Sequence, residues 1–151
     1  MEIVVNKKEL LQYFIQLNEE WISTYFELEE ADFALAKHPN QIIENGGYVF
    51  SMLIGGSVVG VCALFNEGNG IYQLARMAVS PKFHRQGFGA MLIEACLSKL
   101  KEVKADRVYL ISNTRLTSAI ALYKKYNFVT TYEGVHPIYS RANICMERKI
   151  L

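Results

Sequence analysis

The segment from His84 to Ala90 holds the residues with the clearest chemical purpose in this 151-residue chain. We name it the glycine loop, and its residues are His84, Arg85, Gln86, Gly87, Phe88, Gly89 and Ala90. Glycines allow a ligand to approach the backbone closely, and the first N–H groups of a helix have no partner within it. These donors and the positive end of the helix dipole favour phosphate oxygens. Because an amphipathic stretch follows and Arg85 adds a cation, the loop predicts a site for a phosphorylated cofactor.

Two common phosphate-binding motifs do not fit the spacing of the glycine loop. A dinucleotide fingerprint G-x-G-x-x-G that starts at Gly87 requires a small residue where the chain has Leu92. A nucleoside-triphosphate loop requires Gly-Lys followed by Ser or Thr, which this segment lacks. Taken alone, the loop also fits a strand-to-helix turn that binds nothing.

The elements on either side of the loop determine how it is positioned. Residues 71–79 have the composition of a strand, and Ser80-Pro81 follows them. Residues 88–103 place apolar side chains at helical spacing, and 107–112 resembles the next strand. A strand, a loop, a helix and a strand in this order favour two parallel strands joined by a right-handed crossover.

The remaining chain predicts an antiparallel arrangement around this parallel pair. Further strands are expected at 2–5, 48–54, 57–66, 128–133 and 142–148, and further helices at 10–26, 30–37 and 117–126. The first helix is expected to break near Asn18, and Pro39 ends the second one. The expected fold class is therefore α/β (α+β), a mixed and mostly antiparallel sheet with a central parallel strand pair and helices on both faces.

Composition excludes several classes of protein. Lys and Arg total 16 and Asp and Glu total 15, so the net charge of +1 argues against an electrostatic nucleic-acid binder. With 51% hydrophobic and 21% charged residues, the chain is expected to fold as a single domain over residues 1–151. Its three cysteines are widely spaced, which predicts neither a disulfide framework nor a metal site.

The stretch from Asn45 to Asn66 carries no formal charge and is long enough to be considered as a membrane-spanning segment. Gly55-Gly56-Ser57 interrupts it at its centre, and its valines favour strands, so it predicts two buried strands and a tight turn. The N-terminal residues lack an apolar signal segment. We therefore expect no membrane partner and a reducing, cytoplasmic setting.

Two strings of residues resemble one known family. Met77 to Leu92 closely resembles the acetyl-CoA signature of the GNAT acetyltransferase superfamily, in which a strand and a Pro lead into Q/R-x-x-G-x-G/A. Ala119 to Phe128 resembles its second signature, A-I-x-L-Y-x-K-x-G-F. The resemblance extends over about residues 42–148, with a looser similarity at 18–39, and is typical of a small, single-domain, bacterial-type member.

Some positions depart from the family pattern. His84 stands where Gln or Arg is usual, which we expect to be tolerated because backbone N–H groups bind the phosphate. Asn127 replaces a Gly, and asparagine adopts the left-handed conformation more readily than other residues with side chains. Leu116 stands where the family often has Asn, and the Ser112-Asn113 pair suggests that Asn113 lies near the cofactor instead.

The resemblance implies acetyl transfer from acetyl-CoA to a primary amine of a small molecule or peptide by direct attack, without a metal. A bulged strand end would supply N–H groups to the thioester oxygen, and Tyr123 would protonate the leaving thiolate. Without the flanking motif, Tyr123 would be interpreted as a core residue of its helix. The implied cofactor contacts are Met77, Ala78, Val79, His84, Arg85, Gln86, Gly87, Phe88, Gly89, Ala90, Asn113 and Ala119.

The acceptor site of this superfamily is usually formed by the first helices and the last hairpin. The implied substrate contacts here are Tyr25, Phe26, Glu30 and Gln73, with Trp21 and residues 136–141 nearby. Gln73 stands where some members carry a glutamate base, and a glutamine cannot accept the proton. The base is then a water chain or one of Glu29, Glu30, Glu133 and His136.

Two other hypotheses remain open at this stage. The chain could bind acetyl-CoA only as a sensor or interaction module, because the glutamate base is missing. It could also act as a regulatory partner that forms a homodimer through a sheet edge or through its C-terminal strand, where Ile144 and Met146 alternate with other residues. The acceptor, the acyl-chain length and the oligomeric state are left open by the sequence.

Overall fold

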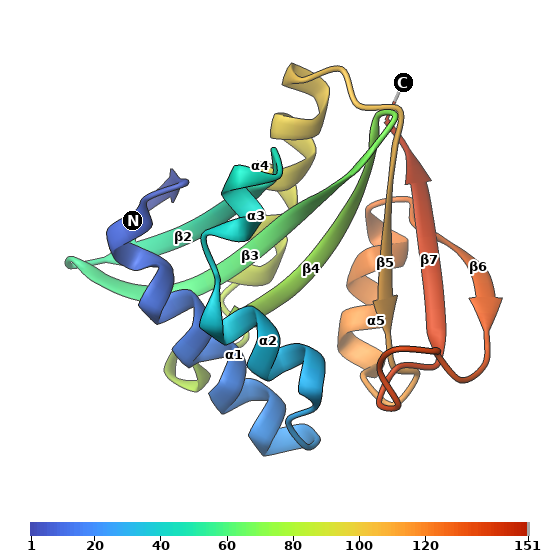
Figure 1. The fold of residues 1–151 in the computed structure, drawn as a ribbon, viewed down its shortest axis with the longest axis horizontal. Coiled ribbons are helices and arrows are strands. Elements are labelled where there is room, and N and C mark those ends of the chain that lie inside the picture. Colours follow the sequence, from blue (N-terminus) through green and yellow to red (C-terminus); the bar gives the residue numbers. More distant parts are fainter. Residues whose placement is uncertain (151) are drawn as a thin grey trace.

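The computed structural model describes residues 1–150, and Leu151, the last residue of the expected domain, lies outside them. Seven strands form one sheet in the order β1-β2-β3-β4-β5-β7-β6 (Figure 1). Their bounds are β1 Glu2–Val5, β2 Tyr48–Ile54, β3 Ser57–Gly68, β4 Ile71–Val79, β5 Arg107–Ser112, β6 Val129–Glu133 and β7 Ile144–Lys149. Neighbours are antiparallel except β4 and β5, so the expected mixed sheet is confirmed.

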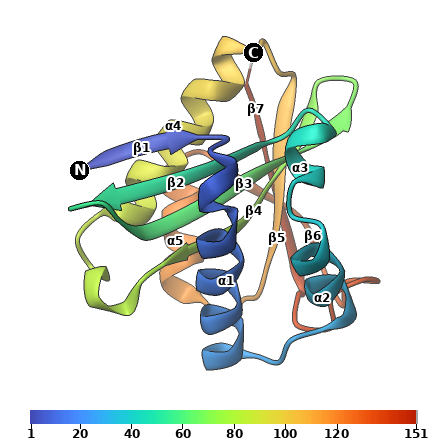
Figure 2. The ribbon, with the colours of Figure 1, turned by 60° about the vertical axis from the view of Figure 1, so that its left-hand side comes forward.

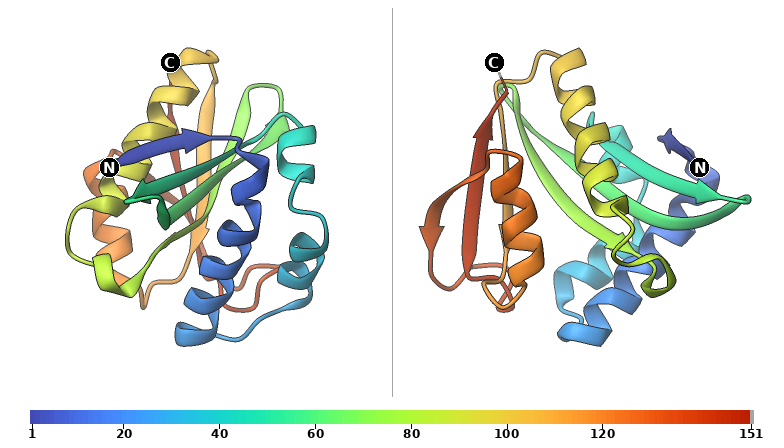
Figure 3. Two further views of the ribbon diagram at one scale, coloured as in Figure 1. Left: turned by 90° about the vertical axis from the view of Figure 1, so that its left-hand side faces the viewer. Right: turned by 180° about the vertical axis from the view of Figure 1, so that it is seen from behind.

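Helices cover both faces of this sheet (Figures 2 and 3). Within residues 1–150 the α-helices are α1 Leu11–Tyr25, α2 Glu30–Lys37, α3 Gln41–Glu44, α4 Phe88–Glu102 and α5 Thr117–Lys125. Short 3-10 helices lie at Lys8–Leu10 and Pro81–Phe83. One apolar cluster lies between the sheet and α4 and α5, and a smaller one lies under α1 and α3. The first buries Phe50, Leu92 and Leu110, while the second is centred on Phe14.

The parallel strands β4 and β5 pair over only part of their length. Their register runs from Ile71 opposite Arg107 to Gln73 opposite Tyr109, and the strands then separate (Figure 1). In β4 the register with β3 shifts where Arg76 and Met77 oppose the single residue Cys62, which is a β-bulge. Arg76 has a positive φ of 59° there. Because a bulge bends its strand and increases the local twist, it helps to turn β4 away from β5.

Helix α1 does not break near Asn18, contrary to the expectation from the sequence. Asn18 is 5% exposed, and its side-chain Nδ2 donates to the backbone oxygen of Phe14, one helical turn earlier, at 3.0 Å. The same nitrogen donates to the backbone oxygen of Arg76 at 3.0 Å. The polar side chain is satisfied without leaving the helix, so the apolar stripe continues through it.

The structure also tests the predictions for the uncharged stretch, the helices and the C-terminal strand. The uncharged stretch forms β2, a two-glycine turn and β3, as predicted, and no helix within residues 1–150 is long and apolar enough to cross a membrane. The short helix α3 was not predicted. In β7, Ile144 and Met146 are buried between β5 and β6, so their alternation reflects the core and does not mark a dimer surface.

Candidate active site

A cavity of about 570 Å³ lies between the separating ends of β4 and β5. Side chains of α1, α5 and the β6–β7 loop, residues 134–143, complete its walls. The cavity brings together residues from segments that are far apart in the chain. The sequence-predicted site residues in its lining are Phe26, Gln73, Met77, Ala78, Val79, His84, Asn113, Ala119 and Tyr123.

The glycine loop continues from His84 to the first turn of α4. The His84 ring Nε2 donates to the Val79 carbonyl oxygen at 2.8 Å, which fastens the start of the loop to the end of β4. Gly87 is the N-cap of the 15-residue α4 with φ of 78°, and a Cβ added there would meet nothing within 4 Å. This left-handed conformation suits glycine, and the backbone there is open to a ligand. The loop residues after His84 lie outside the cavity lining.

The bulge in β4 is held from outside the sheet by α1. Asn18 donates to the Arg76 carbonyl oxygen, so the bulge has a fixed partner in a helix that precedes it by 58 residues in the chain. Met77 belongs to the bulge and Ala78 and Val79 follow it, all three beyond the last pairing of β4 with β5. This side of the strand therefore faces the cavity instead of a neighbouring strand.

Tyr123 lies on α5 and lines the cavity beside Ala119. Its ring packs against Phe128 with centroids 6.0 Å apart. Burial, with a smaller contribution from the Cys62 thiol, raises the pKa of the Tyr123 phenol well above 10. The phenol therefore keeps its proton at neutral and mildly alkaline pH, as a general acid must before it acts.

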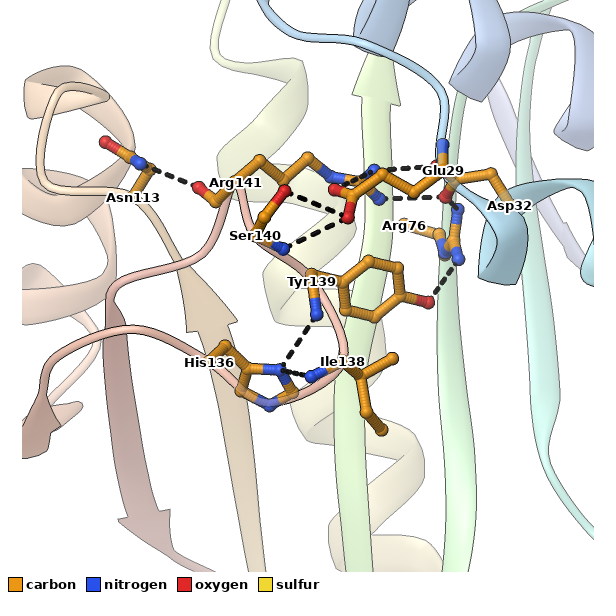
Figure 4. A network of polar contacts seen from close by, with 9 residues as sticks. All are labelled: Glu29, Asp32, Arg76, Asn113, His136, Ile138, Tyr139, Ser140 and Arg141. Carbon is orange, nitrogen blue, oxygen red and sulfur yellow. Dashed lines mark hydrogen bonds and ion pairs between the residues drawn. The ribbon is translucent and has the colours of Figure 1, made fainter.

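On the other side of the cavity, one buried carboxylate organises a network of polar contacts (Figure 4). Asp32 of α2 is 3% exposed. It accepts two hydrogen bonds from Arg141, at 2.6 and 2.8 Å, one from Arg76 at 2.5 Å and one from the Glu29 backbone N–H at 2.8 Å. We call Glu29, Asp32, Arg76, Tyr139 and Arg141 the Asp32 network.

Charge and aromatic contacts stabilise this network. Burial by itself would raise the pKa of Asp32, but hydrogen bonds from Arg141 and Glu29 and the charges of Arg76 and Arg141 lower it overall. The Arg141 and Arg76 guanidinium carbons lie 4.5 and 5.4 Å from the centroid of the Tyr139 ring. Arg76 also donates to the Tyr139 hydroxyl at 2.6 Å. The network therefore joins α2, β4 and the β6–β7 loop.

Asn113 and Gln73 line the cavity, and their side-chain amides form hydrogen bonds within the protein. Asn113 Nδ2 donates to the Arg141 carbonyl oxygen at 2.7 Å, which ties the end of β5 to the β6–β7 loop. The Tyr109 hydroxyl has one proton, which it directs mainly to Glu67 at 2.7 Å, and Gln73 Oε1 lies at a longer 3.3 Å from the same hydroxyl. Burial and the Glu67 carboxylate raise the pKa of Tyr109.

The four side chains considered as bases lie outside the cavity lining. Glu29 contacts Arg141 and Ser140, while Glu30 and Glu133 are exposed. The Nδ1 atom of His136 accepts the backbone N–H groups of residues 138 and 139. Tyr25, which was expected to contact substrate, is also exposed and outside the lining. A water chain is the alternative that the cavity leaves open.

Thiols and metal-ligand groups were also considered as reactive groups. Cys62 and Cys96 are buried with sulfur atoms 3.8 Å apart, and burial raises the pKa of Cys96 well above its usual value. Neither they nor Cys145 line the cavity. Within residues 1–150, no group of three His, Cys, Asp or Glu side chains is arranged to hold a metal ion.

The residues of the cavity and its support that were not identified as site residues from the sequence include Asn18, Asp32, Arg76 and Leu122. Asn18 left a signal, since it is a polar residue inside an apolar helical stripe. Arg76 is a charged residue in a strand that is otherwise largely apolar, which is a weaker signal. Asp32 left none, because its burial depends on arginines 44 and 109 residues away.

Comparisons with known proteins agree with this architecture. A model of the "Acetyltransferase (GNAT) family" matches residues 13–128. A GNAT-family acetyltransferase from Staphylococcus aureus Mu50 superimposes with a TM-score of 0.88 at 17% identity, covering 99% of each chain. Ard1 from Thermoplasma volcanium gives 0.78 at 24% identity, covering 99% of this chain and 97% of that one.

An aminoglycoside 6'-N-acetyltransferase complexed with coenzyme A gives a TM-score of 0.79 at 10% identity, covering 100% of this chain and 98% of that one. No curated protein matches the chain significantly. At these identities the solved structures establish a shared fold, and they confirm the fold class expected from the sequence.

Proposed function

Because the chain belongs to the acetyltransferase (GNAT) family, we propose that it is an acetyl-CoA-dependent N-acetyltransferase that acts on a primary amine of a small molecule or peptide. The observation that carries the proposal is the cavity. Its lining includes the end of β4, His84, Asn113, Ala119 and Tyr123, which come from separate segments of the chain. We further propose that residues 1–151 act as one domain in a reducing, cytoplasmic setting, given three widely spaced cysteines.

The glycine loop fits the phosphates of coenzyme A. Gly87 leaves open space where a side chain would otherwise stand, and the loop leads into the N-terminus of a long helix. Backbone N–H groups of the loop would hold the pyrophosphate, with Arg85 as a cation beside them. The coenzyme A present in the solved aminoglycoside acetyltransferase is consistent with a fold of this kind binding that cofactor.

Acetyl-CoA would supply the acetyl group as a thioester. The backbone N–H groups after the β4 bulge would donate to the thioester oxygen, on which negative charge develops during the reaction. Asn18 would keep these donors in place through its bond to the Arg76 carbonyl. The separation of β4 from β5 would admit the pantetheine arm between Met77 and Ser112.

Tyr123 would donate its phenolic proton to the leaving thiolate. Its raised pKa keeps the phenol protonated until it acts, although the transfer itself is uphill and relies on proximity. The amine would lose its proton to water, because the candidate carboxylates lie outside the cavity. Direct attack on the thioester is supported by the position of the three cysteines, none of which lines the cavity.

The alternative is a domain that binds acetyl-CoA without transferring the acetyl group. It is favoured by one observation: among residues 1–150, no carboxylate lines the cavity to act as a base. The two hypotheses differ in one product. An enzyme releases coenzyme A thiol when acetyl-CoA and an amine are both present, whereas a sensor releases none.

Calorimetric titration with acetyl-CoA tests the cofactor site. Gly87→Glu places a carboxylate where phosphate is expected, and we expect the affinity to fall about a hundredfold or more. Gly68→Glu is the matched control, because Gly68 also has a positive φ, of 86°, with nothing within 4 Å of an added Cβ, and it is the last residue of β3, paired with Ile71 at the start of β4. No binding by the folded wild type, or equal loss in both variants, would contradict the proposal.

A further inference from the structure

The charged side chains in the cavity lining have one sign. Arg76 and Arg141 both line the cavity, whereas no aspartate or glutamate within residues 1–150 does. The His84 imidazole also lines the cavity, at the end near the glycine loop. A site built for a polyamine needs carboxylates facing the ligand, and this cavity has none.

The two arginines are held in place by the Asp32 carboxylate, which does not itself line the cavity. Asp32 bonds to both guanidinium groups but is buried and absent from the lining. Asp32 and Glu29 together balance the two guanidinium charges, but neither carboxylate lines the cavity, so the charged groups of the network in its lining are the two guanidinium groups. Glu29 contacts Arg141 at 3.2 Å and also accepts from Ser140, so it lies at the outer side of the network and does not line the cavity (Figure 4).

The arginines also keep hydrogen-bonding capacity for a ligand. A guanidinium has five N–H donors. The contacts found for Arg76 and Arg141 among residues 1–150 involve their terminal nitrogens, and neither Nε takes part in one. Both guanidinium groups lie against the Tyr139 ring, and the planar N–H donors of a guanidinium suit the oxygens of a carboxylate.

Apolar side chains surround this positive wall. Trp21, Phe26 and Ile138 line the same cavity. Trp21 and Phe26 pack against each other with ring centroids 6.1 Å apart, and the Arg115 guanidinium lies 4.7 Å from the Phe26 centroid. An acceptor with an apolar body would bury its surface here while its charged groups are fixed by the few polar ones.

We propose that the acceptor is an amine that carries a carboxylate close to it, such as an apolar amino acid or short peptide, and that Arg76 and Arg141 bind this carboxylate. The inference rests on the proposed function, since it assigns the substrate class of the same site. A polycationic acceptor is disfavoured, because its second ammonium group would face the two guanidinium groups in a partly desolvated cavity whose lining holds no carboxylate from residues 1–150.

Matched acceptors test the proposal in the wild-type protein. L-phenylalanine, L-leucine and glycyl-L-phenylalanine are each compared with their C-terminal amide, and spermidine serves as the polycation. Release of coenzyme A thiol gives kcat/KM, expressed per unprotonated amine because the amide and the acid differ in amine pKa. We expect the carboxylate member of at least one pair to be preferred about tenfold or more, and spermidine to be a poorer acceptor than that member.

Binding provides a second readout that does not require turnover. Trp21 is the only tryptophan in the chain and lines the cavity, so its fluorescence reports occupancy. With coenzyme A present, the same acids should change the fluorescence at concentrations about tenfold lower than their amides.

Variants locate the carboxylate contact. Arg141→Gln should reduce the preference for the acid to about twofold or less, and Arg141→Lys should retain part of it. Arg76 still pairs with Asp32 in both variants, so the carboxylate is not left alone. Arg107→Gln is the control, since Arg107 is ion-paired with Glu147 at the far end of β5 and does not line the cavity. Each variant should bind acetyl-CoA with the affinity of the wild type, which verifies that the variant is folded.

The outcomes separate the inference from the proposed function. A preference for the amides or for spermidine, with coenzyme A released, overturns the inference and leaves the acetyltransferase intact. The same holds if Arg141→Gln keeps the full preference for the acid. If acetyl-CoA binds and no amine releases coenzyme A, the proposed function fails, and the fluorescence titration alone then decides whether a carboxylate site exists.

Discussion

The two halves of the cavity are built in different ways. The proposed cofactor side is formed largely by one continuous stretch, from the bulge of β4 through the glycine loop into α4, and it presents backbone atoms. The proposed acceptor side is formed by side chains of α2, β4 and the β6–β7 loop, joined by contacts between residues 44 and 109 positions apart. The first depends on local conformation, and the second depends on the whole fold.

This difference predicts different consequences for variants on the two sides. The cofactor side relies largely on backbone atoms, so removal of a single polar group there should reduce activity or cofactor affinity while the free energy of unfolding stays nearly constant. A member of the Asp32 network holds three segments together, so its loss should reduce stability as well. The variants below follow in order of decreasing expected effect.

Tyr123→Phe gives the largest expected effect and acts on the cofactor side. We expect kcat to fall about 10²- to 10⁴-fold, as for other general acids, while acetyl-CoA affinity and the free energy of unfolding change little. Because the pKa of Tyr123 is raised well above 10, wild-type kcat should not decline between pH 7 and about 10. Steady-state kinetics across this pH range provide the measurement.

The control for Tyr123 is Tyr126→Phe at the end of the same helix. The Tyr126 hydroxyl donates to Glu94 at 3.1 Å and does not line the cavity. Similar losses of kcat in both variants would contradict the acid role of Tyr123 and would attribute its effect to the packing of α5.

Asp32→Asn acts on the acceptor side and should reduce the free energy of unfolding by about 3–5 kcal/mol, because two partly buried arginines lose their shared, buried carboxylate. Thermal or denaturant unfolding measures the loss. Asp106→Asn is the exposed control, for which we expect a change within about 0.5 kcal/mol. Equal stability of the two variants would contradict a structural role for the network.

The same residue predicts an acid dependence. The folded chain holds the pKa of Asp32 below its ordinary value, so the unfolded chain binds this proton more readily. Its contribution to stability is present above about pH 4 and is lost as pH falls through the lowered pKa. Unfolding of Asp32→Asn should lack this component, so the difference in stability between variant and wild type should shrink as pH falls below about 4. A constant difference across that range would contradict the assignment.

Asn18→Ala lies between the two sides, because α1 contributes to the acceptor wall while Asn18 holds the bulge on the cofactor side. Loss of its bond to the Arg76 carbonyl should reduce the free energy of unfolding by about 1–3 kcal/mol and should lower kcat more than it raises the KM for acetyl-CoA. Thr24→Ala is the control, since Thr24 donates to the Glu20 carbonyl of the same helix and to nothing in β4. An unchanged kcat would show that the bulge keeps its shape without Asn18.

Glu29→Gln should give the smallest effect. Glu29 is the outer, partly exposed member of the network, and such ion pairs contribute about 0–1 kcal/mol. Chemical denaturation of Glu29→Gln and of Asp32→Asn gives the two free energies of unfolding, and their difference compares the outer carboxylate with the inner one. If Glu29→Gln lost as much free energy of unfolding as Asp32→Asn, the outer carboxylate would contribute as much to stability as the buried one.

Much of the fold could be predicted because its signals are local. Apolar spacing gave β2, β4, β5, α4 and α5 to within a residue or two, and the glycine pair gave the β2–β3 turn. The break expected at Asn18 was wrong, because the carbonyl of Arg76 that satisfies its side chain comes from β4. A helix propensity cannot include a partner that only the folded chain supplies.

The sequence by itself determined the family, the order of the elements and the glycine loop, because a backbone cradle is encoded by neighbouring residues whose conformations are restricted locally. Tertiary structure alone decided that Asp32 is buried, that Arg76 and Arg141 share it, and that no carboxylate within residues 1–150 lines the cavity. Charge at a site depends on which side chains from distant segments meet and which of them water still reaches. Those distances and exposures exist only once the sheet and its helices have packed.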